Sequence, residues 1–160
     1  MYGSSAPRLE LPRREALRLF GMLLVGGALL PLPAAWADAG SDETAAFAAG
    51  TLAKVLAALG ARPEANDAIR LSVPDFVENG AVVPVEVTST LSGAQQLYII
   101  SEANPFPLVA KFGFPEGTEP YVSTRIKVAS SCNIYAVVKS QDRYYSAVKA
   151  TQVTVGGCGA

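Results

Sequence analysis

Histidine is absent from this chain of 160 residues, and cysteine occurs only twice. A sequence without histidine cannot form a Ser-His-Asp triad, a Cys-His dyad or a histidine-containing zinc site. Two cysteines are also too few for a four-cysteine metal site. These absences exclude several classes of nucleophilic catalysis and of zinc binding.

The chain also lacks an excess of charge of either sign. Its 13 Lys and Arg residues nearly balance 14 Asp and Glu residues, and charged residues make up only 17% of the chain. A nucleic-acid-binding protein usually carries a basic patch, so we expect no nucleic-acid partner. The length fits a single domain with an additional terminal segment.

No apolar run is long enough to cross a membrane as a helix. The run at residues 19–32 has 14 residues, whereas a spanning helix needs ~20. Arginines precede this run and an Ala-Trp-Ala site follows it, which is the layout of a secretory signal. Arg13 and Arg14 resemble the pair of a twin-arginine export signal. We therefore expect residues 1–37 to be an export signal and the mature protein to be periplasmic; a buried N-terminal helix or a retained anchor is the alternative.

The mature chain is expected to begin with one helix. Apolar residues recur at helical spacing from about residue 44 to residue 59, and Gly60 is a suitable C-terminal stop. Ser41 or Asp42 can cap the N-terminus, whereas Gly50 weakens the middle by up to ~1 kcal/mol. We interpret residues 38–67 as this helix and a linker. The apolar residues at this spacing are Phe47, Leu52, Val55, Leu56 and Leu59.

Residues 68–155 have the character of strands throughout. Short apolar or alternating runs are separated by turn signals such as Asn79-Gly80 and Ser92-Gly93, without helices between them. About seven such strands predict an all-β, immunoglobulin-like antiparallel β-sandwich. The expected strands cover residues 69–73, 82–89, 97–101, 108–114, 121–128, 133–139 and 144–155, the last of which could be two short strands.

The C-terminus carries the residues most suggestive of chemistry. After the last strand the chain ends in Gly156, Gly157, Cys158, Gly159 and Ala160. Glycine has the freest backbone, so we expect a flexible arm that extends roughly 16 Å from the last strand. The sequence thus predicts one thiol on a slim tether.

The reactivity of this thiol points to a carrier. An ordinary cysteine is only a few per cent thiolate at neutral pH, and no cation lies within the arm of Cys158. A catalytic nucleophile is normally held beside a base, whereas this one depends on another protein for activation. The alternatives are a frayed end and a structural disulfide with Cys132, which we expect to pack inward at a strand end.

The sequence resembles the SoxY family, the sulfur-carrier subunits of the periplasmic thiosulfate-oxidising (Sox) system. The similarity lies in the terminal Gly-Gly-Cys-Gly after a strand and in Glu-Asn-Gly-Ala-Val-Val-Pro-Val at residues 78–85. It continues at residues 104–108, 114–117 and 121–127. Ala160 stands where the family usually has glycine.

The resemblance implies a non-catalytic carrier with Cys158 as the site of covalent sulfur attachment. Gly156, Gly157 and Gly159 would form the swinging arm, with no cofactor beyond the sulfur species bound to Cys158 and no metal. The implied partners are a SoxZ-like subunit in a heterodimer, a SoxAX-type haem enzyme and a SoxB-type dimanganese hydrolase. A sulfane dehydrogenase is a further possible partner, and no membrane partner is implied.

Two other functions remain open from the residues alone. The first is a periplasmic dithiol redox protein that uses Cys132 and Cys158, although no Cys-x-x-Cys motif supports it. The second is an immunoglobulin-like module with an incidental tail. The basic side chains are expected to form a solvated face, with guidance of a negatively charged cargo as the alternative; these are Arg125, Lys127, Lys139 and Arg143.

Overall fold

The computed structural model describes the backbone of residues 38–154 and the side chains of residues 43–154. All of these belong to the compact unit Ala35–Ala160. The expected export signal at residues 1–37 and the arm at residues 156–160 lie outside the described residues. The elements in chain order are α2 (Asp38–Ala48), α3 (Leu52–Ala58), β1 (Glu64–Ala65), β2 (Ile69–Ser72), β3 (Phe76–Val77), β4 (Val83–Ser89), β5 (Ala94–Ser101), β6 (Leu108–Gly113), β7 (Tyr121–Ile126), β8 (Cys132–Ser140) and β9 (Arg143–Val153).

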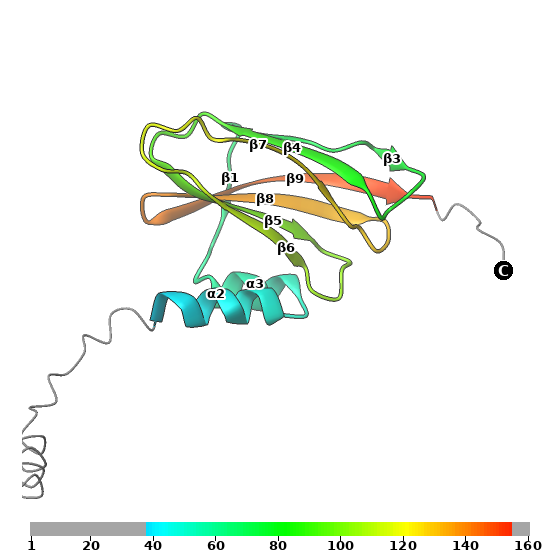
Figure 1. Ribbon diagram of the computed structural model, residues 1–160, viewed down its shortest axis with the longest axis horizontal. Helices are drawn as coiled ribbons and strands as arrows, with labels where there is room; N and C mark the ends of the chain where they lie inside the picture. The colour runs from blue at the N-terminus through cyan, green and yellow to red at the C-terminus, as the bar shows by residue number, and fades with distance from the viewer. Residues whose placement is uncertain (1–37, 155–160) are drawn as a thin grey trace, which may run out of the picture. The chain divides into compact units, whose positions relative to one another are not determined.

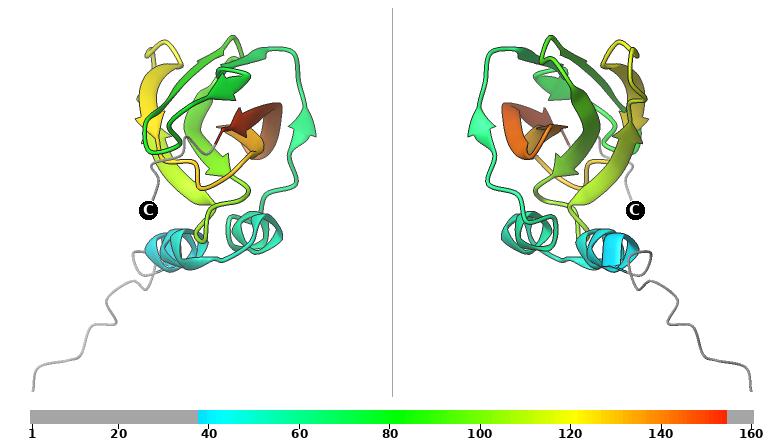
Figure 2. Two further views of the ribbon diagram at one scale, coloured as in Figure 1. Left: turned by 90° about the vertical axis from the view of Figure 1, so that its right-hand side faces the viewer. Right: turned by 90° about the vertical axis from the view of Figure 1, so that its left-hand side faces the viewer.

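The strands form two sheets that pack face to face. The larger sheet has the order β1-β9-β8-β5-β6, with β3 also paired to β9, and the smaller sheet has the order β2-β4-β7. Figure 1 shows β4 and β7 lying over the larger sheet, with the two helices on its opposite side. The end views in Figure 2 show the same three layers. Among the described residues, seven strands have four or more residues, so the predicted immunoglobulin-like sandwich is confirmed.

Alternation of side chains along the strands builds the core between the sheets. In β4, Val83, Val85 and Val87 are buried, while Pro84 and Glu86 between them are exposed. Side chains on successive residues of a strand point to opposite faces, so this pattern places one apolar face inward. The buried members of the core are Ile69, Val73, Val83, Val85, Val87, Leu97, Ile99, Val122, Ile126, Val128, Ile134, Ala136 and Val138.

A second apolar cluster attaches the helices to the outer face of the larger sheet. Val55 of α3 is completely buried and belongs to the same cluster as Tyr98 and Ile100 of β5 and Val137 of β8. The hydroxyl of Tyr144 donates a hydrogen bond to the carbonyl oxygen of Leu59 at 3.0 Å. The helices therefore cover apolar sheet surface that would otherwise face water.

The prediction of one N-terminal helix capped by Ser41 or Asp42 is wrong. The helix α2 begins at Asp38, so both residues lie inside it, and a break separates it from α3. Thr51 is extended and its hydroxyl accepts the backbone N–H of Lys54 at 3.3 Å, which caps a new helix. Glycine at position 50 has low helix propensity, so the break falls where propensity is weakest. Phe47, expected on the apolar face, is 41% exposed.

Two further differences concern the smallest strands. The expected linker at residues 61–67 contains β1, and β3 was not predicted; both pair in parallel with β9, so the larger sheet is not purely antiparallel. A strand of two residues is too short to show alternation of apolar and polar side chains. It is recognised only by its hydrogen bonds to a neighbouring strand. The last strand, β9, is one continuous strand of 11 residues rather than two.

Candidate functional site

The predicted site residues Gly156, Gly157, Cys158 and Gly159 lie outside the described residues. The structure describes the strand that leads to them, the surface around its last residue, and Cys132. Strand β9 pairs with β8 along one edge, while β1 and β3 border its other edge. The C-terminal arm is therefore joined to an interior strand of the larger sheet.

Side-chain and backbone hydrogen bonds hold the end of β9 on both edges. On one edge, the N–H of Thr154 donates to the carbonyl oxygen of Val77 at 2.9 Å. On the other edge, the N–H of Val153 donates to the hydroxyl of Ser131 at 2.9 Å. The buried hydroxyl of Thr151 donates to the carbonyl oxygen of Pro74 at 2.7 Å. Hydrogen bonds thus hold the chain up to Thr154, the last described residue.

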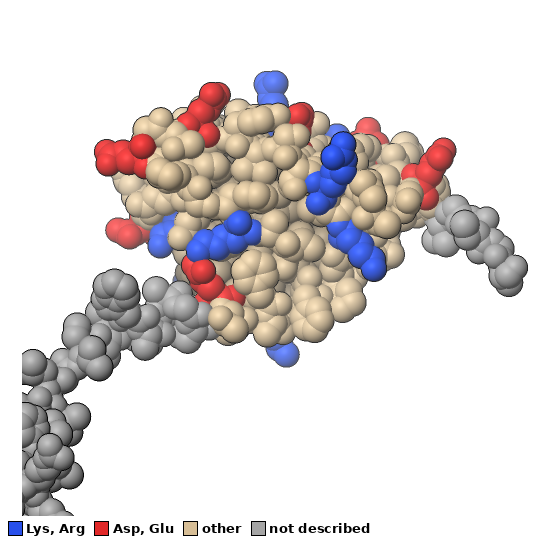
Figure 3. All heavy atoms as spheres, in the orientation of Figure 1, with Lys and Arg blue, Asp and Glu red and all other residues tan. Residues whose placement is uncertain are grey.

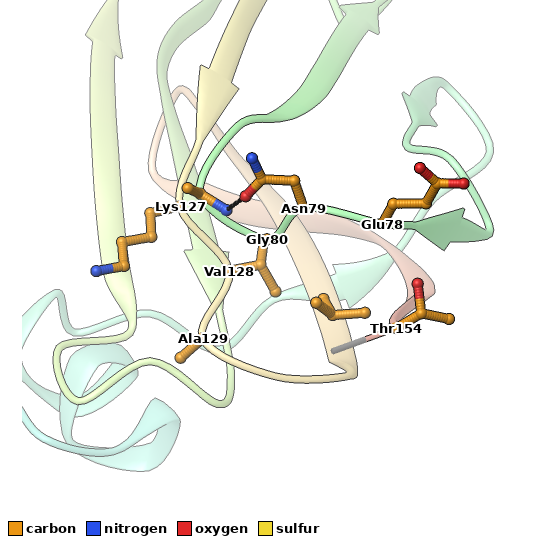
Figure 4. A pocket seen from close by; sticks show the side chains of 9 residues that line it. Glu78, Asn79, Gly80, Lys127, Val128, Ala129 and Thr154 are labelled. Atoms are coloured by element: carbon orange, nitrogen blue, oxygen red, sulfur yellow. Dashed lines mark hydrogen bonds between the residues drawn. The ribbon is translucent and has the colours of Figure 1, made fainter. Parts of the chain in front are cut away.

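A hollow of about 270 Å³ opens beside this last described residue. We call it the exit hollow. Gly80 and Val128 lie between Lys127 on one side and Glu78 on the other, with Thr154 close to the end of β9 (Figure 4). Its lining consists of Glu78, Asn79, Gly80, Ala81, Lys127, Val128, Ala129, Val153 and Thr154.

Gly80 is required by close packing beneath the exit hollow. A Cβ at this position would lie 2.3 Å from the carbonyl oxygen of Val128 and 3.1 Å from a methyl carbon of Val153. The N–H of Val128 donates to the carbonyl oxygen of Gly80 at 2.7 Å, which explains the close approach of the two backbones. Sequence reasoning identified Asn79-Gly80 as a turn and as part of the run at residues 78–85. It missed this contact, because the contact depends on a residue 48 positions away.

Cys132 lies on the other side of β9, opposite Thr151 in the β8–β9 register. It is a free cysteine of intermediate burial that packs against the core, as predicted from its parity with Ile134. Its sulfur is 3.6 Å from the hydroxyl oxygen of Ser101. It also lines a separate hollow together with Glu102, Asn133 and Ala150.

The basic side chains singled out in the sequence do not gather into one patch. On the face drawn in Figure 3, Lys and Arg side chains lie at several separate places, and some of them adjoin Asp or Glu side chains. Arg143 pairs with Glu64 at 2.8 Å, and Lys139 lies 5.9 Å from the centre of the Tyr144 ring. Over residues 43–154, Lys127 takes part in no ion pair.

Two tyrosines near the helices, the buried Tyr98 and the half-buried Tyr135, are weaker acids than usual. Burial, with smaller contributions from Tyr144 and Glu43, raises the pKa of Tyr98 to about 12. Burial is also the main cause that raises the pKa of Tyr135, followed by the charge of Glu102. Both therefore stay protonated at neutral pH and supply no base.

The described part of the chain offers neither a metal site nor a spanning helix. Residues 43–154 contain no group of three or more Cys, Asp or Glu side chains placed to hold a metal ion. No helix within the described residues combines the length and apolar character needed to span a membrane.

Comparison with known proteins identifies the family. Residues 55–158 match the family described as "Sulfur oxidation protein SoxY". The sulfur carrier protein SoxY from Chlorobium limicola f thiosulfatophilum is similar in structure, with a TM-score of 0.57 and 35% identity over 63% of this chain and 93% of that one. A superoxide reductase (neelaredoxin) from Ignicoccus hospitalis has 21% identity and a TM-score of 0.45, covering 54% of this chain and 80% of that chain. Comparison with curated proteins gives no match. Because the family match spans more than half of the sequence, this chain belongs to the SoxY family.

Proposed function

We propose that this protein is a covalent sulfur carrier of thiosulfate oxidation that holds sulfur intermediates on the thiol of Cys158. The observation that carries the proposal is the family match, which extends through residue 158 and so includes this cysteine. The similarity to a SoxY described as a sulfur carrier protein supports the same role. The hydrogen-bonded end of β9 supports it as well, because a carrier needs a firm attachment for its tether.

The chemistry of loading requires an electron acceptor in a partner enzyme. A thiolate of Cys158 and thiosulfate combine into a Cys–S–S–SO₃⁻ group, and two electrons pass to a SoxAX-type haem enzyme. Water then cleaves the terminal S–S bond in a SoxB-type dimanganese hydrolase, which releases sulfate and two protons and leaves Cys–S–S⁻. The remaining sulfane sulfur is oxidised by a sulfane dehydrogenase or passed on.

In this proposal the chain itself is not an enzyme. It carries no cofactor apart from the sulfur on Cys158, and the partner active sites supply activation. Gly156, Gly157 and Gly159 lack a Cβ, so they allow the tether to follow its cargo into a narrow channel. A SoxZ-like subunit forms a heterodimer with this chain, and export through the twin-arginine signal at residues 1–37 places the pair in the periplasm.

Intact-protein mass spectrometry tests the carrier role. The protein is incubated with thiosulfate and the haem partner, and the mass of one thiosulfonate group is expected on the wild type and on Cys132→Ser. The Cys158→Ser variant should show no such increment. Equal labelling of Cys158→Ser and wild type would disprove the attachment site.

Thiol titration separates the carrier from the dithiol redox alternative. The redox alternative requires a reversible disulfide between Cys132 and Cys158, so two thiols would appear together on reduction. A carrier instead shows one persistently modified cysteine, with Cys132 remaining a free thiol as it is in the structure.

A further inference from the structure

We propose that helix α2 is a releasable guard that keeps the outer edge of β6 from pairing with a second copy of this chain. Three features support the inference: β6 has an unpaired edge, α2 lies beside that edge, and small side chains hold α2 in place. Helix α2 also precedes residues 55–158, the part of the chain that matches the family. The inference goes beyond the proposed function and does not depend on it.

Strand β6 lies at the end of the larger sheet and, among the described strands, pairs only with β5. The N–H of Phe114 donates to the carbonyl oxygen of Gln95 at 2.8 Å. Alternate residues of an antiparallel strand direct their backbone groups to the same neighbour, so Phe112 also faces β5. Lys111 and Gly113 therefore direct their N–H and C=O groups away from β5. Such an edge is a template for another strand.

The edge of β6 is complementary to itself. The strand has six residues and no proline, so no position lacks a backbone donor. Two copies can pair in antiparallel fashion, because the same edge serves as both partners of a two-fold interface. A register with Lys111 of one copy opposite Gly113 of the other uses the outward groups of both residues. It also keeps the two lysines from lying directly opposite each other.

The end of this edge is accessible. A hollow of about 400 Å³ lies there, lined by Gln95, Gln96, Lys111, Gly113, Phe114 and Pro115. Gly113 is exposed, and a Cβ at this position would meet nothing within 4 Å. A second strand can therefore approach the backbone at this point.

Helix α2 lies beside β6 on the outer side of the larger sheet (Figures 1 and 2). Glu43 of α2 forms an ion pair with Lys111 of β6. Ala46 of α2 is completely buried, in the cluster that also contains Tyr98 of β5 and Leu108 of β6. The helix therefore occupies space that a second copy would need in order to reach this edge. Covering an edge with a helix is one way in which proteins prevent unwanted strand pairing.

The attachment of α2 is weak enough to allow release. Ala46 is the buried side chain of its described part, whereas Phe47, the large apolar residue beside it, is 41% exposed. Burial of a methyl group stabilises much less than burial of a leucine or phenylalanine side chain. The break at Gly50 and Thr51 separates α2 from α3, so α2 can open while α3 stays on the sheet. Local opening of this kind does not require the sandwich to unfold.

Two aspartate substitutions in the full chain test the guard. Ala46→Asp places a carboxylate at a completely buried position and should detach α2. Ala45→Asp adds the same residue at the exposed neighbouring position and is the matched control. Hydrogen exchange measured by mass spectrometry reports the opening of α2, and sedimentation velocity over a series of concentrations reports association. A background of Cys132→Ser and Cys158→Ser excludes dimers linked by a disulfide.

In the Ala46→Asp variant, the amides of α2 should exchange at least about tenfold faster than in Ala45→Asp, while β4 and β8 keep the wild-type exchange. Ala46→Asp should also form a dimer at concentrations at which Ala45→Asp and the wild type remain monomers. Adding Gly113→Pro removes one of the outward N–H groups and should weaken this dimer about tenfold.

Three results would overturn the guard. If Ala46→Asp speeds exchange in the sandwich as much as in α2, the helix is an integral part of the fold. If α2 opens and association does not increase, the edge of β6 needs no guard. If Gly113→Pro leaves the dimer unchanged, the dimer forms through a different surface. These measurements do not involve sulfur on Cys158, so they leave the test of the carrier role separate.

Discussion

At the scale of single residues, close contacts determine which side chains fit near the end of β9. Gly80 is the clearest case, because the backbone of Val128 occupies the space that a side chain would need. Glycine here has no positive φ, so its role is one of close approach rather than of an unusual backbone conformation. A larger residue at position 80 would require a shift of the backbone at position 80 or at Val128.

We therefore expect Gly80→Ala to lower the free energy of unfolding by about 1–3 kcal/mol, the usual cost of an overpacked site. Gly113→Ala is the matched control, because a Cβ at that position meets nothing within 4 Å. Urea unfolding followed by circular dichroism measures both. Equal stability of the two variants would contradict the close contact at Gly80.

A second residue-scale prediction concerns alkaline pH. Burial raises the pKa of Tyr98 from 10.0 to about 12, so the folded state holds this proton more tightly than the unfolded state. The associated stabilisation is complete below pH 10 and is lost as the pH rises towards 12. We expect the free energy of unfolding to fall across this window, and Tyr98→Phe to reduce the fall.

Denaturant unfolding at several pH values between 9 and 12 measures this dependence. Tyr121→Phe, at a tyrosine that is 51% exposed, is the matched control. An identical slope for Tyr98→Phe and the wild type would show that Tyr98 does not carry the effect.

At the scale of elements, short segments depend on their caps and partners. Helix α3 has only seven residues, which is too short to be stable alone in water. Its formation depends on the Thr51 cap and on burial of Val55 against the larger sheet. Strands β1 and β3 similarly exist only through their pairing with β9.

The cap of α3 offers an element-scale test. Replacing Thr51 by alanine removes the oxygen that accepts the Lys54 N–H, and we expect a loss of about 0.5–2 kcal/mol in the free energy of unfolding. Thr51→Ser keeps the oxygen and should retain most of the stability. Thermal unfolding of both variants measures these stabilities. A Thr51→Ala variant as stable as the wild type would show that packing alone holds the helix.

At the scale of the whole molecule, the proposed function assigns different roles to the sandwich and to the C-terminal residues. The core between the two sheets and the hydrogen bonds at the end of β9 supply a firm base. In the proposed function, sulfur travels on Cys158 while the sandwich is available to bind a permanent partner. Stability and transfer should therefore respond to different substitutions.

The Gly157→Val variant separates these two properties. A branched side chain in the tether obstructs a narrow active-site channel, so we expect several-fold slower sulfur transfer with the partner enzymes. Thermal stability should stay at the wild-type value, because residue 157 follows the last strand. Unchanged turnover would contradict the swinging-arm role of this glycine.

Much of this organisation could be predicted from local patterns. The seven longer strands follow from period-2 alternation and turn residues, as in β4, and the SoxY family was recognised from its terminal motif together with the run at residues 78–85. The division of the N-terminal helix at Gly50 and Thr51 was missed, because apolar spacing continues across the break. The exit hollow was also missed, since its lining combines three separate segments of the chain.

The sequence by itself determined the sandwich class, the family and the thiol-bearing terminus, because each is encoded in neighbouring residues. Only the tertiary structure decided that Gly80 and Val128 meet beneath a hollow at the end of β9, with Lys127 and Glu78 at its sides. It also decided the pairing of β1 and β3 with β9. Contacts of this kind join residues far apart in the chain, and no local periodicity specifies which distant backbones approach one another.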